Sequence, residues 1–286
     1  MKDCKDILVT GGAGFIGTNL IKRLLKDGHN VVSIDNYSTG NEENEQEGCT
    51  YHNVDIRDAV DFDFFMENPD VIYHLAALPR IQPSFEFPAL TMEIGMLGTM
   101  NILEWARNKE CKVIYAGSSS VHSGHYSNPY TFSKVMGDEL CMAYKQMFGV
   151  DTKICRFYNV YGPHQLTEGE YCTVIGVFEK QYKEGVDLTI TGDGFQRRDF
   201  THIDDIVEGL ILTSESEEFD LDIVELGRGH NHSINELAEM FGCEYTYIPK
   251  RPGEAEVTLC DTSVAKKDIG YNPKVNLEDY VKEVTK

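Results

Sequence analysis

The sequence predicts an α/β protein with a doubly wound parallel sheet and a smaller α/β lobe, and three observations favour this fold. Short runs rich in β-branched residues alternate with longer amphipathic runs through the first 160 residues. A glycine cluster separates the first short run from the first long one. The chain has 286 residues, 41% of them hydrophobic, so it can bury one large core or two lobes. Such an alternation is typical of parallel strands connected by helices.

The predicted elements follow one another in a regular order. The acidic segment 41–48 is predicted to be a solvated loop, with a lid as the alternative. The predicted strands span residues 6–10, 30–35, 71–76, 111–117 and 151–157, and the predicted helices span 15–28, 90–109 and 130–149.

The regular alternation of predicted strands and helices becomes less clear after residue 160, which indicates a second structural unit. We expect residues 1–163 to form the larger domain, to which residues 195–230 return. Residues 164–194 and 231–286 are expected to form the smaller lobe over the carboxyl ends of the strands.

Composition narrows the class of partner. There are 26 basic and 47 acidic residues, a net charge of −21, which disfavours nucleic acid and anionic membrane surfaces as partners. An anionic ligand would therefore depend on a few arginines and on backbone N–H groups. The N-terminus is charged and no apolar run approaches the ~20 residues of a membrane span, so we expect a cytoplasmic protein without a membrane partner. Eight cysteines without a C-x-x-C pair argue against a metal site and a disulfide framework.

The glycine cluster "TGGAGFIG" predicts a phosphate-binding turn. Gly12, Gly14 and Gly17 satisfy G-x-G-x-x-G. Gly11, Gly14 and Gly17 give the G-x-x-G-x-x-G variant. Missing side chains let the backbone turn sharply and approach a pyrophosphate, which the following helix N-terminus attracts. The alternative is an ordinary tight turn.

Two aspartates extend this Rossmann-type pattern. Asp35 closes the second strand 18 residues after Gly17, where a carboxylate binds the ribose 2′-hydroxyl and repels a 2′-phosphate. NAD is therefore predicted in preference to NADP. Asp55 lies in "NVDIRD", between the strands predicted at 30–35 and 71–76, where its carboxylate either accepts a hydrogen bond from the adenine amino group or caps the next turn.

Three features further along the chain predict a catalytic centre. The fourth strand ends in a serine run that includes Ser118 and Ser119, "NPYTFSK" places Tyr130 and Lys134 four residues apart, and Asn159 follows the fifth strand. Residues i and i+4 share one face of a helix, so the Lys134 ammonium is expected to lower the pKa of the Tyr130 phenol and make it a base. Without the glycine cluster, this spacing is common by chance on amphipathic helices.

In this order the motifs resemble the extended short-chain dehydrogenases/reductases of the nucleotide-sugar epimerase and dehydratase type. "TGGAGFIG", "HLAA", Y-x-x-x-K, "RFYNVYGP", "GDGFQRRDFTHIDD" and "RPGE" occur in family order between residues 10 and 254. The resemblance implies a catalytic triad of Ser118, Tyr130 and Lys134, with Tyr130 and Lys134 also at the cofactor. It also implies a homodimer paired through the helices expected at 89–108 and 131–148.

The same resemblance implies two sets of binding residues. For the cofactor they are Gly11, Gly14, Phe15, Ile16, Gly17, Asp35, Asn36, Asp55, Ile56, Leu75, Ala76, Ala77 and Tyr158. For the nucleotide sugar they are Ser119, Asn159, Val174, Arg198, Arg251 and Thr258, with Val174 against the uracil. Two alternatives stay open, in which Arg198 only pairs with Asp199 and Arg251 is an ordinary surface residue.

The resemblance further implies NAD-dependent epimerisation at C4 of a nucleotide sugar, with uridine as the preferred base. Related dehydratases and decarboxylases carry carboxylates just after the catalytic serine or threonine, where this chain has Ser119 and Ser120. Thr258 is small where glucose-restricted enzymes often carry tyrosine, so UDP-N-acetylglucosamine is a candidate substrate beside UDP-glucose. The alternatives are a 4,6-dehydratase or other keto-sugar enzyme, and a non-catalytic NAD-binding regulator.

Three positions depart from the family pattern. Only 12 positions separate Ser118 from Tyr130, which is shorter than usual, and His122 replaces a common tyrosine. Gly95 lies where the family normally has asparagine. We expect the short loop either to open the pocket or to weaken the positioning of Tyr130, and we expect His122 and His125 to be polar surface residues.

Overall fold

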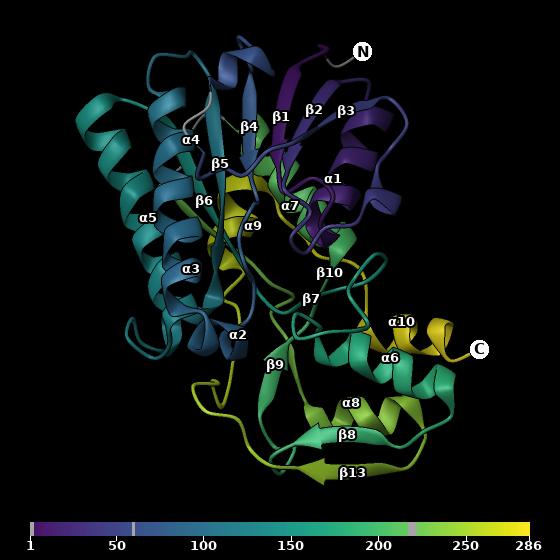
Figure 1. Ribbon diagram of the computed structural model, residues 1–286. Coiled ribbons are helices and arrows are strands. Elements are labelled where there is room, and N and C mark those ends of the chain that lie inside the picture. The colour runs from purple at the N-terminus through teal and green to yellow at the C-terminus, as the bar shows by residue number, and fades with distance from the viewer. Residues whose placement is uncertain (1–2, 59–60, 217–221) are drawn as a thin grey trace.

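The computed structural model describes residues 3–58, 61–216 and 222–286, which form a large lobe and a smaller one (Figure 1). A seven-stranded sheet in the order β11-β6-β5-β4-β1-β2-β3 fills the large lobe, and every neighbouring pair is parallel. This confirms the predicted doubly wound α/β fold. The strands are β1 (Asp6–Thr10), β2 (Asn30–Asp35), β3 (Cys49–Asn53), β4 (Val71–His74), β5 (Lys112–Ser118), β6 (Asp151–Phe157) and β11 (Ile223–Leu226).

The order of the strands reverses between β1 and β4. From β1 the chain adds β2 and β3 on one side, then returns to add β4, β5 and β6 on the other. In such sheets a ligand crevice forms at this switch point, outside the carboxyl ends of the strands. Most of the predicted cofactor residues lie at these strand ends or just after them, whereas Tyr130 and Lys134 lie on a helix.

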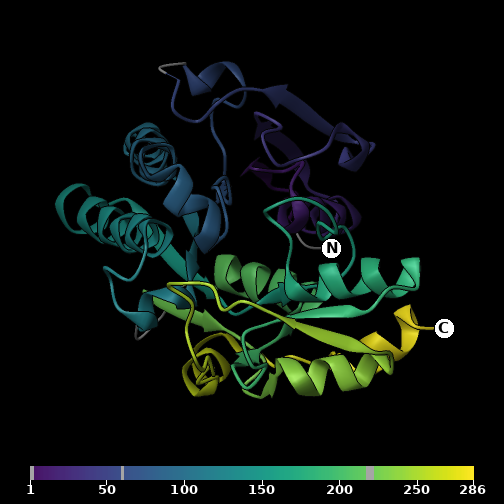
Figure 2. The same cartoon turned by 60° about the horizontal axis from the view of Figure 1, so that its bottom comes forward.

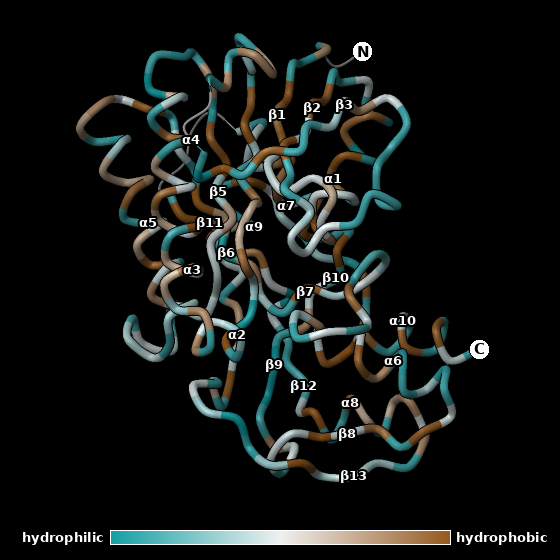
Figure 3. Tube along the Cα trace, viewed as in Figure 1, coloured by the Kyte–Doolittle hydropathy of each residue, from teal (hydrophilic) through white to brown (hydrophobic). Residues whose placement is uncertain are grey.

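Successive side chains along each strand point to opposite faces of the sheet, so a hydrophobic core forms on each face. In β1, Ile7 and Val9 belong to one core and Leu8 to the other, and all three are at most 1% exposed. The first core includes residues of α1 (Phe15–Lys26) and α7 (Ile203–Glu215). The second includes residues of α4 (Thr99–Ala106) and α5 (Pro129–Phe148). Figure 3 shows the hydrophobic segments concentrated in the central strands.

The helix predicted over 90–109 is interrupted. The structure has α3 (Pro88–Met92), a π-helical turn η3 (Glu93–Gly98) and then α4. The interruption coincides with two close contacts, since a Cβ on Gly95 would lie 2.8 Å from Ser133 Cβ and one on Gly98 2.4 Å from Ile56 Cδ1. Gly95, where the family normally has asparagine, therefore lets this segment pack closely on α5.

The smaller lobe lies below the carboxyl ends of the large sheet (Figures 1 and 2). Its own core includes Ile175, Phe178, Leu188 and Leu237. The helices are α6 (Val174–Glu184), α8 (Ile234–Phe241) and α10 (Leu277–Val284). The strand pairs are β8 (Leu188–Thr191) with β13 (Tyr245–Ile248), β9 (Arg197–Asp199) with β12 (Asn231–Ser233), and β7 (Val160–Tyr161) with β10 (Thr201–His202).

The chain crosses between the lobes more often than the sequence boundaries imply. Helix α9 (Ser263–Ile269) packs on β11 and α7 in the large lobe, although it lies within the segment 231–286. Strand β9 pairs with β12 of the smaller lobe, although it lies within 195–230. The short elements η1 (Glu42–Asn44), η2 (Phe62–Phe64), α2 (Ile81–Glu86) and η4 (Ser119–Ser123) complete the described chain.

Within the described ranges, no helix combines the length and apolarity needed to cross a bilayer. The same residues contain no cluster of histidine, cysteine and acidic side chains suited to a metal ion.

Candidate active site

A cavity of about 480 Å³ opens at the carboxyl ends of the sheet, between the two lobes. Its walls include the glycine turn, the ends of β2, β4 and β5, the start of α5, and segments of the smaller lobe. Every residue predicted to bind cofactor or substrate, or to act in catalysis, lines this cavity except Tyr158. Residues separated by more than 200 positions in the sequence are thus brought to one site.

The glycine turn has no room for side chains. Gly11 has φ +76°, and a Cβ there would lie 2.9 Å from the Ala76 backbone. A Cβ on Gly17 would lie 2.2 Å from the Gly11 carbonyl oxygen, so the following helix packs directly on the turn. Gly14 caps α1 without a side-chain bond, which leaves the first N–H groups of the helix for a ligand. These features fit the pyrophosphate of a dinucleotide.

Asp35 is held at the end of β2 with its carboxylate at the cavity. It is 8% exposed and accepts hydrogen bonds from the backbone N–H groups of Ala13 (2.9 Å) and Tyr37 (2.8 Å). Burial raises the pKa of Asp35, and these two hydrogen bonds oppose that effect. Each oxygen keeps further acceptor capacity, so the fixed carboxylate suits the hydroxyl groups of a ribose.

Asp55 caps the next turn, which was one of the two interpretations that the sequence allowed, and it also lies at the cavity wall. Its Oδ1 accepts a hydrogen bond from the backbone N–H of Arg57 (2.9 Å), as a turn-capping aspartate does, while the residue also lines the cavity. Its Oδ2 accepts one from the Asn36 side chain (2.9 Å). Hydrogen bonds from the Arg57 side chain are the main cause that lowers the pKa of Asp55 to about 2. Asp55 and Asn36 are therefore fixed relative to each other at the cavity wall.

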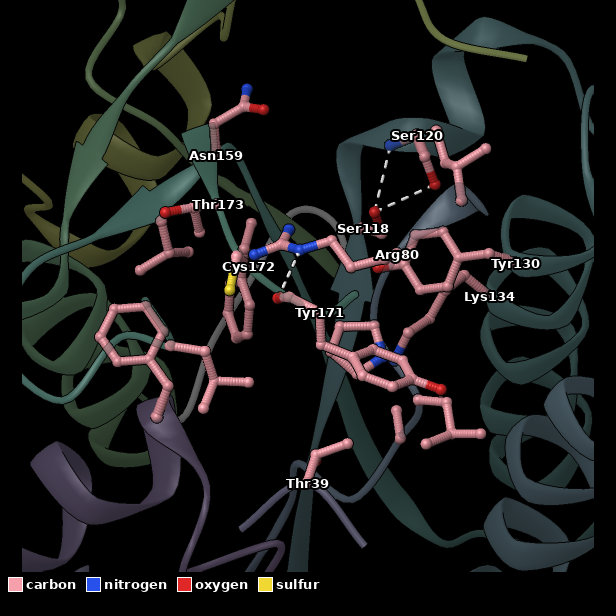
Figure 4. Close-up of a pocket in the computed structure, with 18 of the residues that line it drawn as sticks. Thr39, Arg80, Ser118, Ser120, Tyr130, Lys134, Asn159, Tyr171, Cys172 and Thr173 are labelled. Carbon is pink, nitrogen blue, oxygen red and sulfur yellow. Dashed lines mark hydrogen bonds between the residues drawn. The ribbon is translucent and has the colours of Figure 1, made fainter. Parts of the chain in front are cut away.

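The short loop before α5 leaves Tyr130 well positioned. The Asn128 side chain accepts a hydrogen bond from the Thr131 N–H (2.7 Å) and Pro129 occupies the first helical position, so the helix begins at a defined residue. The Tyr130 N–H donates to Ser84 Oγ (3.1 Å). Figure 4 shows the Tyr130 ring and the Ser118 side chain beside each other at the cavity, and Ser118 helps to lower the pKa of the phenol.

Lys134 is buried beneath this pair, at 6% exposure. Its ammonium donates a 2.7 Å hydrogen bond to the Ala116 carbonyl oxygen and lies 5.1 Å from the centre of the Tyr115 ring. Burial lowers the pKa of Lys134 to about 8, and the Asp138 carboxylate opposes this shift. The lysine is thus anchored to β5 as well as to α5.

The electrostatics of Tyr130 correct one expectation. Burial raises the pKa of its phenol, while the neighbouring Ser118 side chain and the positive charge of Arg80 lower it. In this structure the cation that opposes the rise is therefore Arg80, not Lys134 as the i, i+4 spacing predicted. The phenol alone, without a ligand, has a pKa above its ordinary value.

Arg80 is the functional candidate that sequence reasoning missed. It has φ +99° and directly precedes α2, and its Nε donates a 2.9 Å hydrogen bond to the Tyr171 carbonyl oxygen. Figure 4 shows the side chain reaching across the cavity from the side of Tyr130 toward Cys172. The available signal was a lone arginine just after "HLAALP" in a strongly acidic chain.

The substrate side of the cavity contains a polar cluster from both lobes. Asn159, with φ +24°, donates hydrogen bonds to Thr258 Oγ1 (3.1 Å) and to the Asp199 carbonyl oxygen (3.1 Å). The Asp199 carboxylate accepts from the backbone N–H groups of Arg228, Gly229 and Cys260, at 2.8, 2.9 and 3.0 Å. The Asp199 carboxylate is therefore occupied by hydrogen bonds from the main chain.

The two substrate arginines differ in burial. Arg198 has a side chain 12% exposed, lies 3.6 Å from the Glu254 carboxylate and has a pKa lowered by burial. It thus does not pair with Asp199, which was the alternative left open by the sequence. Arg251 is exposed at the rim of the cavity, where it serves either as a ligand or as a surface residue.

Tyr158 is the one predicted site residue that points elsewhere. It is 4% exposed and stacks on His122, with ring centres 6.4 Å apart. His122 Nε2 lies 2.9 Å from Glu225 Oε1, and none of these three residues lines the cavity. His122 and His125 both lie on the surface.

Comparison with known proteins supports the family and the fold. Residues 7–227 match the model of the NAD dependent epimerase/dehydratase family. A putative UDP-glucose 4-epimerase of Methanocaldococcus jannaschii is 32% identical, with 97% of this chain and 96% of that protein covered. UDP-glucuronic acid decarboxylase 1 of Xenopus tropicalis is 31% identical, covering 97% of this chain and 70% of that protein.

Two solved structures are similar over nearly the whole chain. The crystal structure of a Thermotoga maritima UDP-glucose 4-epimerase with UDP-glucose has a TM-score of 0.90 at 27% identity, covering 98% of this chain and 97% of that one. That of a Bacillus cereus UDP-glucuronic acid 4-epimerase with UDP-glucuronic acid and NAD has a TM-score of 0.86 at 30% identity, covering 97% and 96%.

Proposed function

Because the chain belongs to the NAD-dependent epimerase/dehydratase family, we propose that it inverts C4 of a UDP-sugar through a transient 4-keto intermediate. NAD is the cofactor of this family, and the glycine turn with Asp35 fits it. The observation that carries the proposal is the position of Tyr130 beside Ser118 in the cavity next to that turn. It puts a base and a hydroxyl donor at one point.

The proposed chemistry needs few groups from the protein. Tyr130, as phenolate, accepts the proton of the sugar 4-hydroxyl, and the Ser118 hydroxyl donates a hydrogen bond to the oxygen that becomes a carbonyl. When bound, NAD supplies a reversible acceptor for the hydrogen at C4. Lys134 stays fixed by its hydrogen bond to the Ala116 carbonyl oxygen, on the helix that also carries Tyr130. The cavity of about 480 Å³ provides space for the sugar to turn before reduction from its other face.

Two serines favour epimerisation over elimination or decarboxylation. Ser119 and Ser120 occupy positions where the resemblance places acids in dehydratases and decarboxylases. The Ser120 N–H and Oγ are both engaged with Ser118 Oγ, at 3.2 and 3.0 Å, so this segment supports the serine hydroxyl. The second candidate is a 4,6-dehydratase or another keto-sugar enzyme, and the similarity to a UDP-glucuronic acid decarboxylase keeps the latter kind open.

The test is a panel of UDP-, GDP-, dTDP- and CDP-sugars incubated with the protein, with the products identified by NMR. Epimerisation of a UDP-sugar supports the proposal, whereas loss of water indicates the dehydratase. A protein that holds NAD but leaves every sugar unchanged is a regulator. Within the panel, UDP-glucose and UDP-N-acetylglucosamine are both expected substrates, because Thr258 leaves room beside the sugar.

We propose further that the protein is a homodimer. Leu97 and Met100 on the η3–α4 segment and Met147 and Phe148 on α5 are large apolar side chains between 39% and 73% exposed. They lie on two segments that pack against each other, which suits pairing with the same face of a second copy. Light scattering of the wild type and of Met100→Glu tests this, and a monomeric wild type contradicts it.

A further inference from the structure

Arg80 places in the cavity a positive charge that lowers the pKa of Tyr130, although the guanidinium itself accepts and donates no proton in the proposed reaction. Its guanidinium is held by a single hydrogen bond through Nε to the Tyr171 carbonyl oxygen, at 2.9 Å. This bond leaves the two Nη groups for a ligand, and in Figure 4 they face the space between Asn159 and Cys172. A residue other than glycine with φ +99° costs conformational energy, and such strain is typical of functional positions.

This guanidinium has no acid of its own. Among the described residues, the carboxylate whose charge most clearly acts on Arg80 is that of Glu254, and Glu254 forms its ion pair with Arg198 at 3.6 Å. Burial lowers the pKa of Arg80, as expected of a cation that lacks a close counter-ion. A desolvated cation of this kind is stabilised when an anion binds.

The position of Arg80 relative to Tyr130 indicates which part of the substrate it meets. The charge of Arg80 acts directly on the Tyr130 phenol, which in the proposed function contacts the oxygen on C4 of the sugar. In a pyranose ring C5, which carries C6, adjoins C4, whereas C1, which carries the diphosphate, lies opposite. A cation beside the C4 oxygen is therefore nearer to a group on C6 than to the diphosphate.

We propose that Arg80 binds a carboxylate on C6 of the sugar, so that the preferred substrate class is a nucleotide-linked uronic acid rather than a neutral hexose. A guanidinium pairs with a carboxylate through two parallel hydrogen bonds, and the free Nη groups suit this geometry. The diphosphate is left to Asn159, Arg198 and Arg251. This inference rests on the proposed function, because that function places C4 at Tyr130.

The experiment measures binding to the NAD-loaded protein by calorimetry, with UDP-glucuronic acid and UDP-glucose as probes. The wild type is expected to bind the uronic acid at least about tenfold more tightly. Arg80→Gln keeps a polar side chain but removes the charge, and it should weaken UDP-glucuronic acid about 10- to 100-fold, the usual range for lost hydrogen bonds to a charged group. UDP-glucose should change less than about threefold, since a neutral C6 hydroxyl gains little from the charge.

Arg251→Gln is the matched control, because it removes the charge of an arginine predicted to bind the diphosphate that both probes carry. It should weaken both probes to a similar extent. Equal affinity of the wild type for the two probes, or an equal loss of both in Arg80→Gln, overturns the inference. If Arg80→Gln does not fold, two other measurements test the inference. They are the affinities of Arg80→Lys for the two probes and the preference of the wild type for UDP-glucuronic acid.

Turnover separates this inference from the proposed function. Epimerisation of UDP-glucose without a preference for the uronic acid preserves the proposed function and overturns the role of Arg80. A binding preference that depends on Arg80 without any turnover preserves the inference and overturns the proposed activity.

Discussion

The Lys134 ammonium donates a 2.7 Å hydrogen bond to the main-chain carbonyl oxygen of Ala116, so the helix that carries Tyr130 is tied to the strand that carries Ser118. The lysine therefore has a structural contact in addition to its predicted catalytic role. The hydrogen bond of the ammonium stabilises the fold, whereas the burial of its charge destabilises it.

Lys134→Met should abolish turnover and stabilise the protein without its cofactor. Burial lowers the pKa of Lys134 from 10.5 to about 8, so at neutral pH the folded state holds a desolvated charge that the unfolded chain does not. Replacing it should raise the free energy of unfolding at pH 7 by about 2 kcal/mol, after allowance for the lost hydrogen bond. Turnover should fall at least about 100-fold.

The difference in the free energy of unfolding between the wild type and Lys134→Met should change with pH in a definite direction. Between pH 8 and 10.5 the folded protein binds fewer protons at Lys134 than the unfolded chain, so this contribution becomes more favourable to folding as the pH rises. Denaturant unfolding at pH 7 and pH 10 should show the gap between wild type and Lys134→Met closing. An equal gap at both values would contradict the buried charge as its cause.

Tyr130→Phe should lower turnover by about 10²- to 10⁴-fold while bound NAD, released by heat and quantified, stays near the wild-type amount. The phenol is the proposed base, whereas the glycine turn and Asp35 remain intact. Tyr126→Phe is the control, since Tyr126 lies in the same short loop, is 88% exposed and does not line the cavity. Comparable losses in both variants would remove Tyr130 from the mechanism.

Thr258→Val should raise the KM for UDP-sugars by about tenfold, because the lost hydroxyl accepts the Asn159 side chain and the Asp199 N–H, each at 3.1 Å. Asn159 would then lose one of its two anchors. Thr258→Ser keeps the hydroxyl and should behave as the wild type in steady-state kinetics. A similar KM for the valine and serine variants would show that the hydroxyl of Thr258 does not matter for substrate binding.

Gly95→Ala should destabilise the protein by about 1–3 kcal/mol, because the new Cβ would lie 2.8 Å from Ser133 Cβ. Thermal or denaturant unfolding measures the loss. Adding Ser133→Gly removes the opposing atoms and should restore part of the stability. Failure of the double variant to recover would place the strain elsewhere.

The sequence could predict what depends on local periodicity. The β1 run, the glycine turn and Asp35 were recognisable because their roles follow from spacing along the chain. The same reasoning, carried further, would have corrected Tyr158, since Phe157 and Asn159 on either side of it line the cavity and alternate residues of an extended segment face opposite ways.

Other features depend on distant residues and could not be read from spacing. The interruption at Gly95 reflects the position of Ser133, which lies on another helix. The influence of Arg80 on Tyr130 depends on a side chain that reaches across the cavity to the Tyr171 carbonyl oxygen. Both relationships arise only when the lobes and helices are packed together.

The passage of α9 back into the large lobe means that neither lobe is a separable piece of chain. A fragment ending at Asp261 would lack Ala265, Ile269 and Tyr271, which complete the core beside β11. The lobes are therefore expected to melt in a single cooperative transition, and a protease that cuts between them should not release a folded half.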